Sequence, residues 1–328
     1  MPLSPPETPE HLLEVSNLKM HFPVAGGLGR PTKHVKAIDG TSFHIDQGET
    51  LGLVGESGCG KSTMGRCLLR LHEPTSGTIR FKGRDLAKMK GRELRAMRRY
   101  IQLVFQDPFA SLDPRMTAAQ IIMEPLVIQG IGSSKERRQR FLELMEMVEL
   151  RPSLGSRYPH EFSGGQRQRI GIARALALNP ELIVGDEPVS ALDVSIQAQI
   201  INLLEDMKRR YGLTLLFIAH DLAVVKAVSD RIAVMYLGKL CEVGPTETLF
   251  AKPAHPYTAL LLEAIPVPDP AVKPASNVAI GEPPSPLAPP SGCRFRTRCP
   301  RADAVCAEVV PPLEEIADGQ FAACHHPL

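Results

Sequence analysis

The sequence has no apolar run long enough to cross a membrane and almost no imbalance of charge. No stretch approaches the roughly 20 apolar residues that a membrane-spanning helix needs. The first ten residues, MPLSPPETPE, have neither a basic start nor an apolar centre and do not resemble a secretory signal. We therefore expect a cytosolic location. Because 38 Lys and Arg residues stand against 36 Asp and Glu residues, the net charge of +2 gives no reason to expect a nucleic-acid partner.

Cysteine is sparse, and its placement is uneven. In a cytosolic chain, seven cysteines favour free thiols or metal ligands over disulfides. Residues 264–292 contain nine prolines and predict an extended linker, and four of the seven cysteines lie beyond it, in residues 293–328. Residues 1–10 are also proline-rich and are predicted to be disordered. The length of 328 residues accommodates one large domain with an appendage, or two domains.

Between these ends, short apolar runs alternate with segments of helical spacing. Strands are predicted over residues 11–22, 35–46, 50–54, 76–81, 101–105, 182–186 and 214–219, with a hairpin over 232–243. Helical faces are predicted from Met64, Cys67, Leu68 and Leu71, from Phe141, Leu144, Met145 and Val148, and from Ile196, Ile200, Leu203, Leu204, Met207 and Tyr211. Ser133 begins a capping box, and Gly212 is a helix stop. The alternation favours an α/β fold whose mainly parallel sheet is covered on both faces.

Residues 50–63, TLGLVGESGCGKST, carry the clearest chemical signal. A buried strand leads into a glycine loop of the form G-x-x-x-x-G-K-S, and a helix follows it. The glycines let main-chain N–H groups surround an anion, and the helix N-terminus adds partial positive charge. Lys61 can reach the β- and γ-phosphates, and the Ser62 hydroxyl can bind Mg²⁺. A chance glycine turn is the alternative, and the correct strand and helix on either side argue against it.

Two further stretches narrow the chemistry. The apolar run Leu182–Asp186 ends in a pair of carboxylates, in which Asp186 suits Mg²⁺ binding through water and Glu187 suits a base that polarises the attacking water. Ordinary acids at a strand end are the alternative. Ser163, Gly164 and Gly165 then place a second anion-binding device at a helix start. One ATP can use both devices only if they come from two chains that face each other head to tail.

With these motifs the sequence resembles the nucleotide-binding subunit of an ABC transporter. That family implies a P-loop ABC ATPase fold, with a RecA-like core sheet, an antiparallel β subdomain and an inserted α-helical subdomain. On this sequence the fold would occupy residues 11–263, with the helical subdomain at about 107–162. Two positions depart from the family pattern: Phe162 stands where leucine is usual, and Gly185 is unusually small for its strand.

The resemblance implies a role for each matched residue. Gln106 would sense metal and water and help Ser62 and Asp186 with Mg²⁺, Glu187 would be the catalytic base, and His220 would hold the γ-phosphate end. ATP would contact Phe22 at the adenine and the Walker A residues Gly55, Glu56, Ser57, Gly58, Cys59, Gly60, Lys61, Ser62 and Thr63. The signature, which completes the partner's site, would be Ser163, Gly164, Gly165 and Gln166, and the D-loop would be Ser190, Ala191, Leu192 and Asp193.

A narrower resemblance is to the ATPases of dipeptide and oligopeptide importers. The segments ESGCGKST, DPFASLDPRMT, DEPVSALDVSIQAQ and HPYTALLLEAIP carry it, together with the tail GCRFRTRCP, and the insert at 23–34 resembles the "F-type" subunit. It implies a peripheral protein on the cytoplasmic face of the membrane, with a paralogous ATPase, two transmembrane permease subunits and, indirectly, an extracytoplasmic substrate-binding protein as partners. The alternatives are import of another solute such as nickel, an exporter subunit, and a soluble ABC ATPase, which the single motif set and the absence of a sustained heptad run disfavour.

The tail cysteines Cys293, Cys299, Cys306 and Cys324 lie in a short polar segment that needs a covalent or metal link to fold. Their spacing leaves two disulfides, a Cys₄ zinc site and an iron–sulfur cluster open, although a cytosolic location argues against disulfides. The importer resemblance implies a [4Fe–4S] cluster, with Zn²⁺ as the alternative. Cys59, Cys67 and Cys241 are predicted to lie in the ATPase core and not to be ligands.

Apolar residues follow Gln106 closely. Because nucleotide state can move this segment, we predict that some of Phe109, Leu112, Met116 and Ile121 line a groove for a helix of the membrane subunit. The alternative is that they belong to the core of the helical subdomain.

Overall fold

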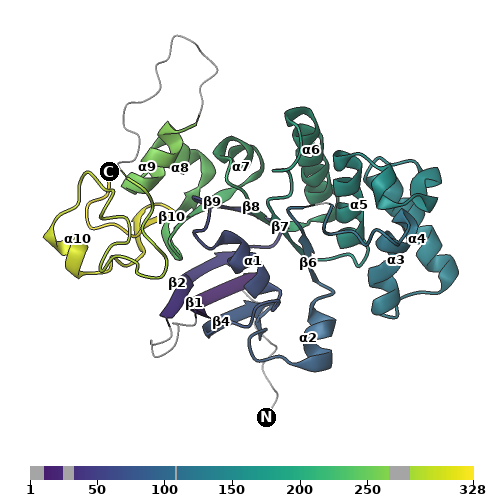
Figure 1. Ribbon diagram of the computed structural model, residues 1–328, viewed down its shortest axis with the longest axis horizontal. Helices are drawn as coiled ribbons and strands as arrows, with labels where there is room; N and C mark the ends of the chain where they lie inside the picture. The colour runs from purple at the N-terminus through teal and green to yellow at the C-terminus, as the bar shows by residue number, and fades with distance from the viewer. Residues whose placement is uncertain (1–10, 25–32, 108, 266–280) are drawn as a thin grey trace, which may run out of the picture.

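Two β-sheets organise the part of the chain that the structure describes. The computed structural model describes residues 11–24, 33–107, 109–265 and 281–328. The predicted disorder of residues 1–10, most of the insert at 23–34 and much of the linker at 264–292 therefore fall outside the described residues. The two sheets meet at a wide angle, with the smaller, purple sheet below the larger one in Figure 1.

The larger sheet has eight strands in the order β11-β12-β10-β9-β3-β8-β7-β6. Five neighbouring strands are parallel, as predicted: β9 (Arg231–Tyr236), β3 (Thr50–Val54), β8 (Thr214–Ile218), β7 (Leu182–Asp186) and β6 (Ile101–Val104). Every residue of β3, β7 and β8 is buried, which is typical of parallel strands covered on both faces. The predicted hairpin is present, because β10 (Lys239–Pro245) pairs antiparallel with β9.

The smaller sheet is antiparallel, as the weak alternation near residue 40 predicted. Its order is β2-β1-β4-β5, formed by β1 (Leu13–Val24), β2 (Lys33–Ile45), β4 (Ser76–Phe81) and β5 (Arg84–Asp85). Between the two sheets lies α1 (Lys61–Leu68), whose buried face includes Met64, Cys67 and Leu68. Leu71 was wrongly placed on this face: it is 49% exposed, because the helix ends at Leu68 and Arg70 takes a left-handed φ of +53°.

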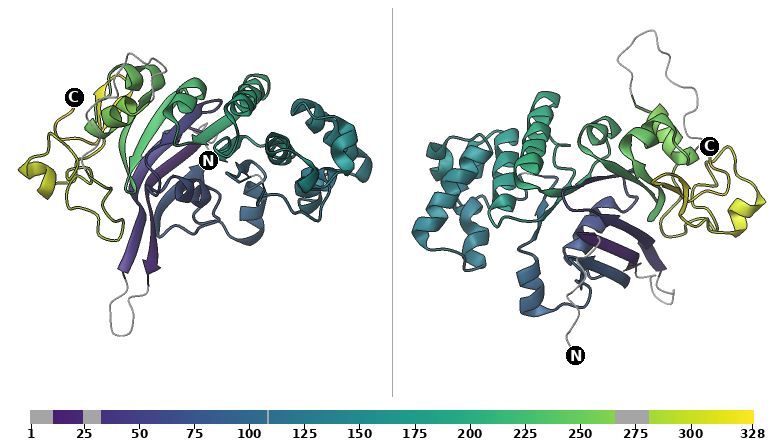
Figure 2. Two further views of the ribbon diagram at one scale, coloured as in Figure 1. Left: turned by 45° about the horizontal axis from the view of Figure 1, so that its top comes forward. Right: turned by 180° about the vertical axis from the view of Figure 1, so that it is seen from behind.

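Helices cover the larger sheet and extend beyond its β6 end as a separate lobe (Figure 2). The lobe contains α3 (Ala118–Ile128), α4 (Ser134–Met147), two short 3₁₀ turns (Pro152–Ser156 and Pro159–Glu161) and α5 (Gly164–Leu176). The predicted face of Phe141, Leu144, Met145 and Val148 forms part of its core. The Ser133 capping box is confirmed, since the Glu136 N–H donates to Ser133 Oγ at 3.3 Å and the Glu136 carboxylate accepts the Ser133 N–H at 2.6 Å.

Six further helices are described. They are α2 (Gly91–Met97), α6 (Val194–Tyr211), α7 (Leu222–Val228), α8 (Thr246–Ala251), α9 (Pro256–Glu263) and α10 (Ala304–Glu308). Of these, α7, α8 and α9 contact strands of the larger sheet. Gly212 ends α6 in the left-handed conformation, as predicted. Most of the α6 stripe is buried, but Tyr211, the last residue of the helix, is 54% exposed and was wrongly placed on this face. Among the described residues, no helix combines the length and apolar character that crossing a bilayer requires.

The C-terminal segment differs most from the sequence prediction. We expected a polar tail isolated by the linker, but β12 (Gln320–Ala322) pairs with β10 and β11 (Glu314–Ala317) pairs with β12, so the tail extends the larger sheet. Phe295 of this segment is fully buried against the rings of Tyr236 and Tyr257. Hydrophobic contacts and strand pairing with the ATPase core therefore supply the stabilisation that this short polar tail cannot obtain from its own side chains.

Candidate functional site

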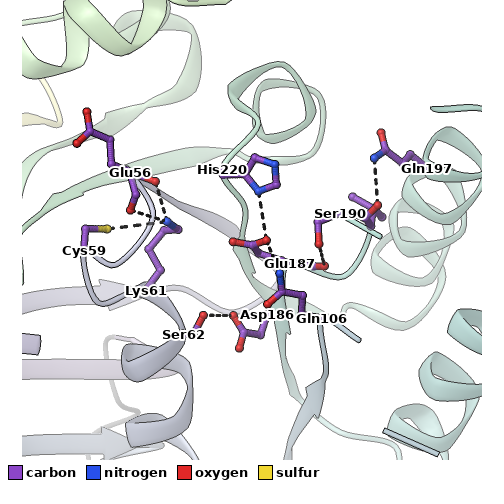
Figure 3. A network of polar contacts seen from close by, with 12 residues as sticks. Glu56, Cys59, Lys61, Ser62, Gln106, Asp186, Glu187, Ser190, Gln197 and His220 are labelled. Atoms are coloured by element: carbon purple, nitrogen blue, oxygen red, sulfur yellow. Dashed lines mark hydrogen bonds and ion pairs between the residues drawn. The ribbon is translucent and has the colours of Figure 1, made fainter. Parts of the chain in front are cut away.

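The phosphate loop connects β3 to α1 in a conformation that only glycine tolerates. Gly55 and Gly60 have φ values of +150° and +112°, and a Cβ on either would lie 2.1 Å from a main-chain oxygen, that of Met235 or Ala37 respectively. The Lys61 ammonium lies over the loop and donates to the carbonyl oxygens of Gly55 at 2.7 Å and Glu56 at 3.1 Å (Figure 3). The lysine is therefore already directed into the loop that the sequence singled out.

Ser62 and Asp186, which are 124 residues apart, lie in direct contact. The Ser62 hydroxyl donates to Asp186 Oδ1 at 2.7 Å. Asp186 ends β7 and is buried, and burial raises the pKa of its carboxyl group, while the hydrogen bond from Ser62 opposes the rise. This places two oxygen ligands of the kind that Mg²⁺ prefers side by side next to the phosphate loop.

Glu187 is the centre of a polar cluster. Its carboxylate accepts a hydrogen bond from Gln106 Nε2 at 2.9 Å and lies 3.2 Å from His220 Nδ1 (Figure 3). Its φ of +48° is uncommon outside glycine, and its N–H donates to the Ile218 carbonyl at 2.9 Å. The three side chains come shortly after β6, β7 and β8 in the sequence. They lie close together because the carboxyl ends of parallel neighbouring strands meet at one edge of a sheet.

One cavity of about 640 Å³ joins these parts. It brings together predicted residues from the loop, the two sheets and the strand ends. It is lined by Phe22, Ser57, Gly58, Gly60, Lys61, Ser62, Thr63, Gln106, Glu187 and His220. Val35 and Ala37 of β2 also line it and were missed, since no motif marks them, although their position opposite the β1 residues could have been inferred from strand pairing.

The signature residues lie elsewhere. Ser163 caps α5 in a capping box with Gln166, and the described residues that line the cavity do not include Ser163, Gly164, Gly165 or Gln166. Of the predicted D-loop, Ser190 donates its hydroxyl to the Glu187 carbonyl oxygen at 3.1 Å, and Asp193 caps α6. The four predicted signature residues therefore do not line the described cavity of their own chain, and their role in a partner's site stays a prediction.

The predicted groove residues separate into two kinds. Leu112 and Ile121 are buried in the core and cannot contact a partner, and Met116 packs partly against the same core. Phe109 is 62% exposed, and the Arg167 guanidinium lies 3.8 Å from the centre of its ring. Only Phe109 of this set is an exposed ring that follows directly on the Gln106 segment.

Comparison with known proteins now identifies the family. Residues 38–190 match the ABC transporter family model, and residues 241–306 match the model of the oligopeptide/dipeptide transporter C-terminal region. A putative oligopeptide transport ATP-binding protein of Bacillus subtilis, YkfD, is 56% identical over 96% of this chain and 95% of its own length. The chain belongs to the ABC transporter ATP-binding subunits of the oligopeptide/dipeptide family.

A second relative and a solved structure support the same family assignment. The oligopeptide transport ATP-binding protein AppF of Bacillus subtilis is 54% identical over 96% of this chain and 97% of its own length. The dimeric structure of a bacterial ABC transporter cassette superposes with a TM-score of 0.63 at 32% identity, covering 71% of this chain and 98% of that one. The predicted P-loop ABC ATPase fold is therefore confirmed.

The three cysteines that were predicted to lie in the ATPase core form a separate group from the four cysteines of the tail. Cys59, Cys67 and Cys241 are buried free thiols, and burial raises the pKa of the Cys67 thiol to about 12. The four tail cysteines, Cys293, Cys299, Cys306 and Cys324, line a single pocket together with His255 and His326. The Cys293 N–H donates to the Cys306 carbonyl oxygen at 2.8 Å, which holds two of them on facing segments.

The spacing of these thiols bears on which metal group they could bind. A single tetrahedral zinc with Zn–S bonds of about 2.3 Å requires sulfurs about 3.8 Å apart. Among the described residues, no three of the four tail thiols have sulfurs within 4.8 Å of one another. Ligand atoms of Asp303, Cys306 and His326 do lie within 4.8 Å of one another, and His326 Nε2 is 2.9 Å from Asp303 Oδ2. The four thiols line one pocket, but this arrangement by itself selects no particular metal group.

Proposed function

We propose that this chain is the ATP-hydrolysing subunit that drives import of di- and oligopeptides through an ABC importer. The convergence of Gln106, Glu187 and His220 on the cavity of the phosphate loop is the observation that carries the hydrolytic part. The peptide part rests on relatives that are named as oligopeptide transport proteins and are at least 54% identical over nearly the whole chain.

Binding of ATP, which precedes hydrolysis, would require Lys61 to change its hydrogen-bond partners. To bind phosphate, its ammonium exchanges the carbonyl oxygens of Gly55 and Glu56 for phosphate oxygens. Ser62, Asp186 and Gln106 would hold Mg²⁺, which neutralises phosphate charge when bound. Phe22, which lines the cavity, would contact the adenine ring.

Glu187 is the base in this scheme. A carboxylate held by Gln106 and His220 is oriented toward the cavity and can polarise a water beside the terminal phosphate. His220 would hold the γ-phosphate end. Ser163 and Gly165 would complete the ATP site of a partner chain, with Gly164 and Gln166 shaping that helix start and the D-loop residues Ser190, Ala191, Leu192 and Asp193 lying at the contact.

The same proposal assigns domains and partners. Residues 11–263 form the ATPase domain, with residues 107–162 as its helical subdomain, 264–292 as linker and 293–328 as the cysteine-rich extension. The chain would pair with a paralogous ATPase beneath two transmembrane permease subunits at the cytoplasmic face of the membrane. An extracytoplasmic binding protein would be an indirect partner that delivers the solute to the permeases.

We further propose that the extension carries a [4Fe–4S] cluster on Cys293, Cys299, Cys306 and Cys324, with Zn²⁺ as the alternative. The four thiols lining one pocket support a shared metal group, and the importer resemblance favours the cluster. Such a group would serve as a structural or regulatory link, because ATP hydrolysis requires no electron transfer.

Reconstitution tests the transport function. The chain is combined in liposomes with its permeases, the paralogous ATPase and the binding protein, and ATP hydrolysis and uptake are measured. We expect dipeptides and oligopeptides to stimulate both. Stimulation by nickel with no response to peptides would reassign the solute, and hydrolysis indifferent to any solute would contradict the transport function.

A further inference from the structure

Arg298 of the cysteine-rich extension contacts Glu56 of the phosphate loop. The Arg298 guanidinium forms two parallel hydrogen bonds with the Glu56 carboxylate, Nη1 to Oε2 at 2.9 Å and Nη2 to Oε1 at 3.0 Å. The two residues are 242 positions apart in sequence. Arg298 is only 9% exposed, so solvent screens this charge pair weakly.

A second contact holds the main chain of the same residue. The Glu56 N–H donates to the Tyr257 hydroxyl at 2.9 Å. Tyr257 is fully buried, and its ring packs against Tyr236 and Phe295 with centroid distances of 4.7 and 5.3 Å. Tyr236 in turn places its hydroxyl 3.3 Å from Arg298 Nη1. Glu56 is thus held at its side chain and at its main chain by residues outside the loop.

These contacts bear directly on the phosphate-binding lysine. Lys61 donates to the Glu56 carbonyl oxygen at 3.1 Å. Glu56, which Arg298 and Tyr257 hold in place, is therefore also a direct contact of Lys61. A loop with three glycines has high conformational freedom, and ordering it opposes ligand binding. Anchoring one of its residues from outside reduces that cost.

We propose that Arg298 is a positioning residue that, together with Tyr257, holds the phosphate loop in its ATP-binding conformation through Glu56. The inference rests on the proposed ATP function of the loop. It also changes the role of Glu56, whose N–H is directed to Tyr257 and not into the cavity.

The test measures binding of a fluorescent ATP analogue with Mg²⁺ to the full chain. Arg298→Met is expected to weaken binding about 2- to 30-fold, the range of couplings transmitted through neighbouring residues. Arg298→Lys should recover part of the loss, since lysine keeps the charge but cannot bond both carboxylate oxygens. Arg296→Met is the matched control, because Arg296 lies in the same segment and bonds to Ser291 instead of the loop.

A double-mutant cycle separates positioning from simple docking of the extension. If Arg298 acts through Glu56, the double variant of Arg298→Met with Glu56→Gln loses no more affinity than the more severe single variant. Losses that multiply would overturn the proposal. In the assembled complex we expect Arg298→Met to raise the KM for ATP while changing kcat at saturating ATP less than twofold.

Tyr257→Phe keeps the test informative if Arg298 variants do not fold. It removes only the hydroxyl that accepts the Glu56 N–H and leaves the ring packing in place. A folded Tyr257→Phe protein with weakened ATP binding supports the proposal, and unchanged affinity in this variant or in folded Arg298→Met contradicts it. If the unaltered chain binds no ATP, the proposed function itself fails, which is a different result.

Discussion

The Gln106 side chain donates a 2.9 Å hydrogen bond to the Glu187 carboxylate although 81 residues separate them. They meet because β6 and β7 are parallel neighbours, with Val104 opposite Gly185 in the ladder. Gln106 is also followed within three residues by the exposed ring of Phe109. A shift of Gln106 with nucleotide state would therefore act both on Glu187 and on the surface beyond it.

Replacing Glu187 tests the proposed base. Glu187→Gln keeps the shape of the side chain but cannot take up a proton, so we expect ATP to bind while turnover at that site falls about 10²- to 10⁴-fold. Single-turnover hydrolysis with labelled ATP measures this directly. Glu263→Gln, on the exposed end of α9, is the matched control and should leave turnover unchanged. Undiminished hydrolysis by Glu187→Gln would remove Glu187 from the role.

A charge at Phe109 tests coupling to the membrane subunits. Phe109→Asp replaces an exposed ring with a carboxylate, so an apolar contact with a permease helix would be lost while the ATP cavity stays intact. We expect normal ATP binding together with loss of complex assembly or of solute-dependent hydrolysis. Val309→Asp introduces the same charge at a 48% exposed valine of the extension and serves as control. Coupled transport that survives Phe109→Asp would place the contact surface elsewhere.

Two glycines of the phosphate loop provide a matched pair for stability. A Cβ at Gly60 would overlap the Ala37 carbonyl oxygen at 2.1 Å, whereas a Cβ at Gly58 meets nothing within 4 Å, and both have positive φ. Gly58→Ala should cost about 1–2 kcal/mol from its left-handed backbone alone, and Gly60→Ala should cost about 1–3 kcal/mol more. Urea unfolding compares the two. Equal midpoints would contradict the close approach of Ala37.

Metal analysis decides the content of the cysteine pocket. Protein purified without oxygen is expected to be brown, with iron and sulfide in equal amounts and a broad visible absorption. Cys299→Ser should remove this absorption and Cys67→Ser should not, since Cys67 is buried in the ATPase core. A colourless protein with one zinc and neither iron nor sulfide would rule out the cluster and leave the zinc alternative.

Alkylation distinguishes the two groups of thiols in another way. With the pKa of Cys67 raised to about 12, only on the order of 10⁻⁴ of this thiol is ionised at pH 8. After removal of metal, iodoacetamide should modify the partly exposed Cys293, Cys299 and Cys324 in the folded protein, and Cys67 only after unfolding. Mass spectrometry of peptides reports the order. Modification of Cys67 in the native protein at the rate of Cys299 would contradict its burial.

Local chemistry explains what was predictable from the sequence alone. The strand, glycine loop and helix of residues 50–68 depend on neighbours only a few positions apart, and so do the capping box at Ser133 and the helix stop at Gly212. Such features can be predicted from sequence because the backbone preferences and side-chain periodicity of neighbouring residues determine them. The family resemblance, and not the local pattern, predicted that Gln106, Glu187 and His220 act at one site.

Tertiary structure decided what the local pattern leaves open. Phe109 and Leu112 are both apolar and three residues apart, yet one is exposed and the other buried, since only the packing of the lobe determines which face is covered. The extension joins the sheet through β12, and Arg298 reaches Glu56 across 242 residues. No spacing in the sequence specifies such pairings, because they form between surfaces that exist only after each part has folded.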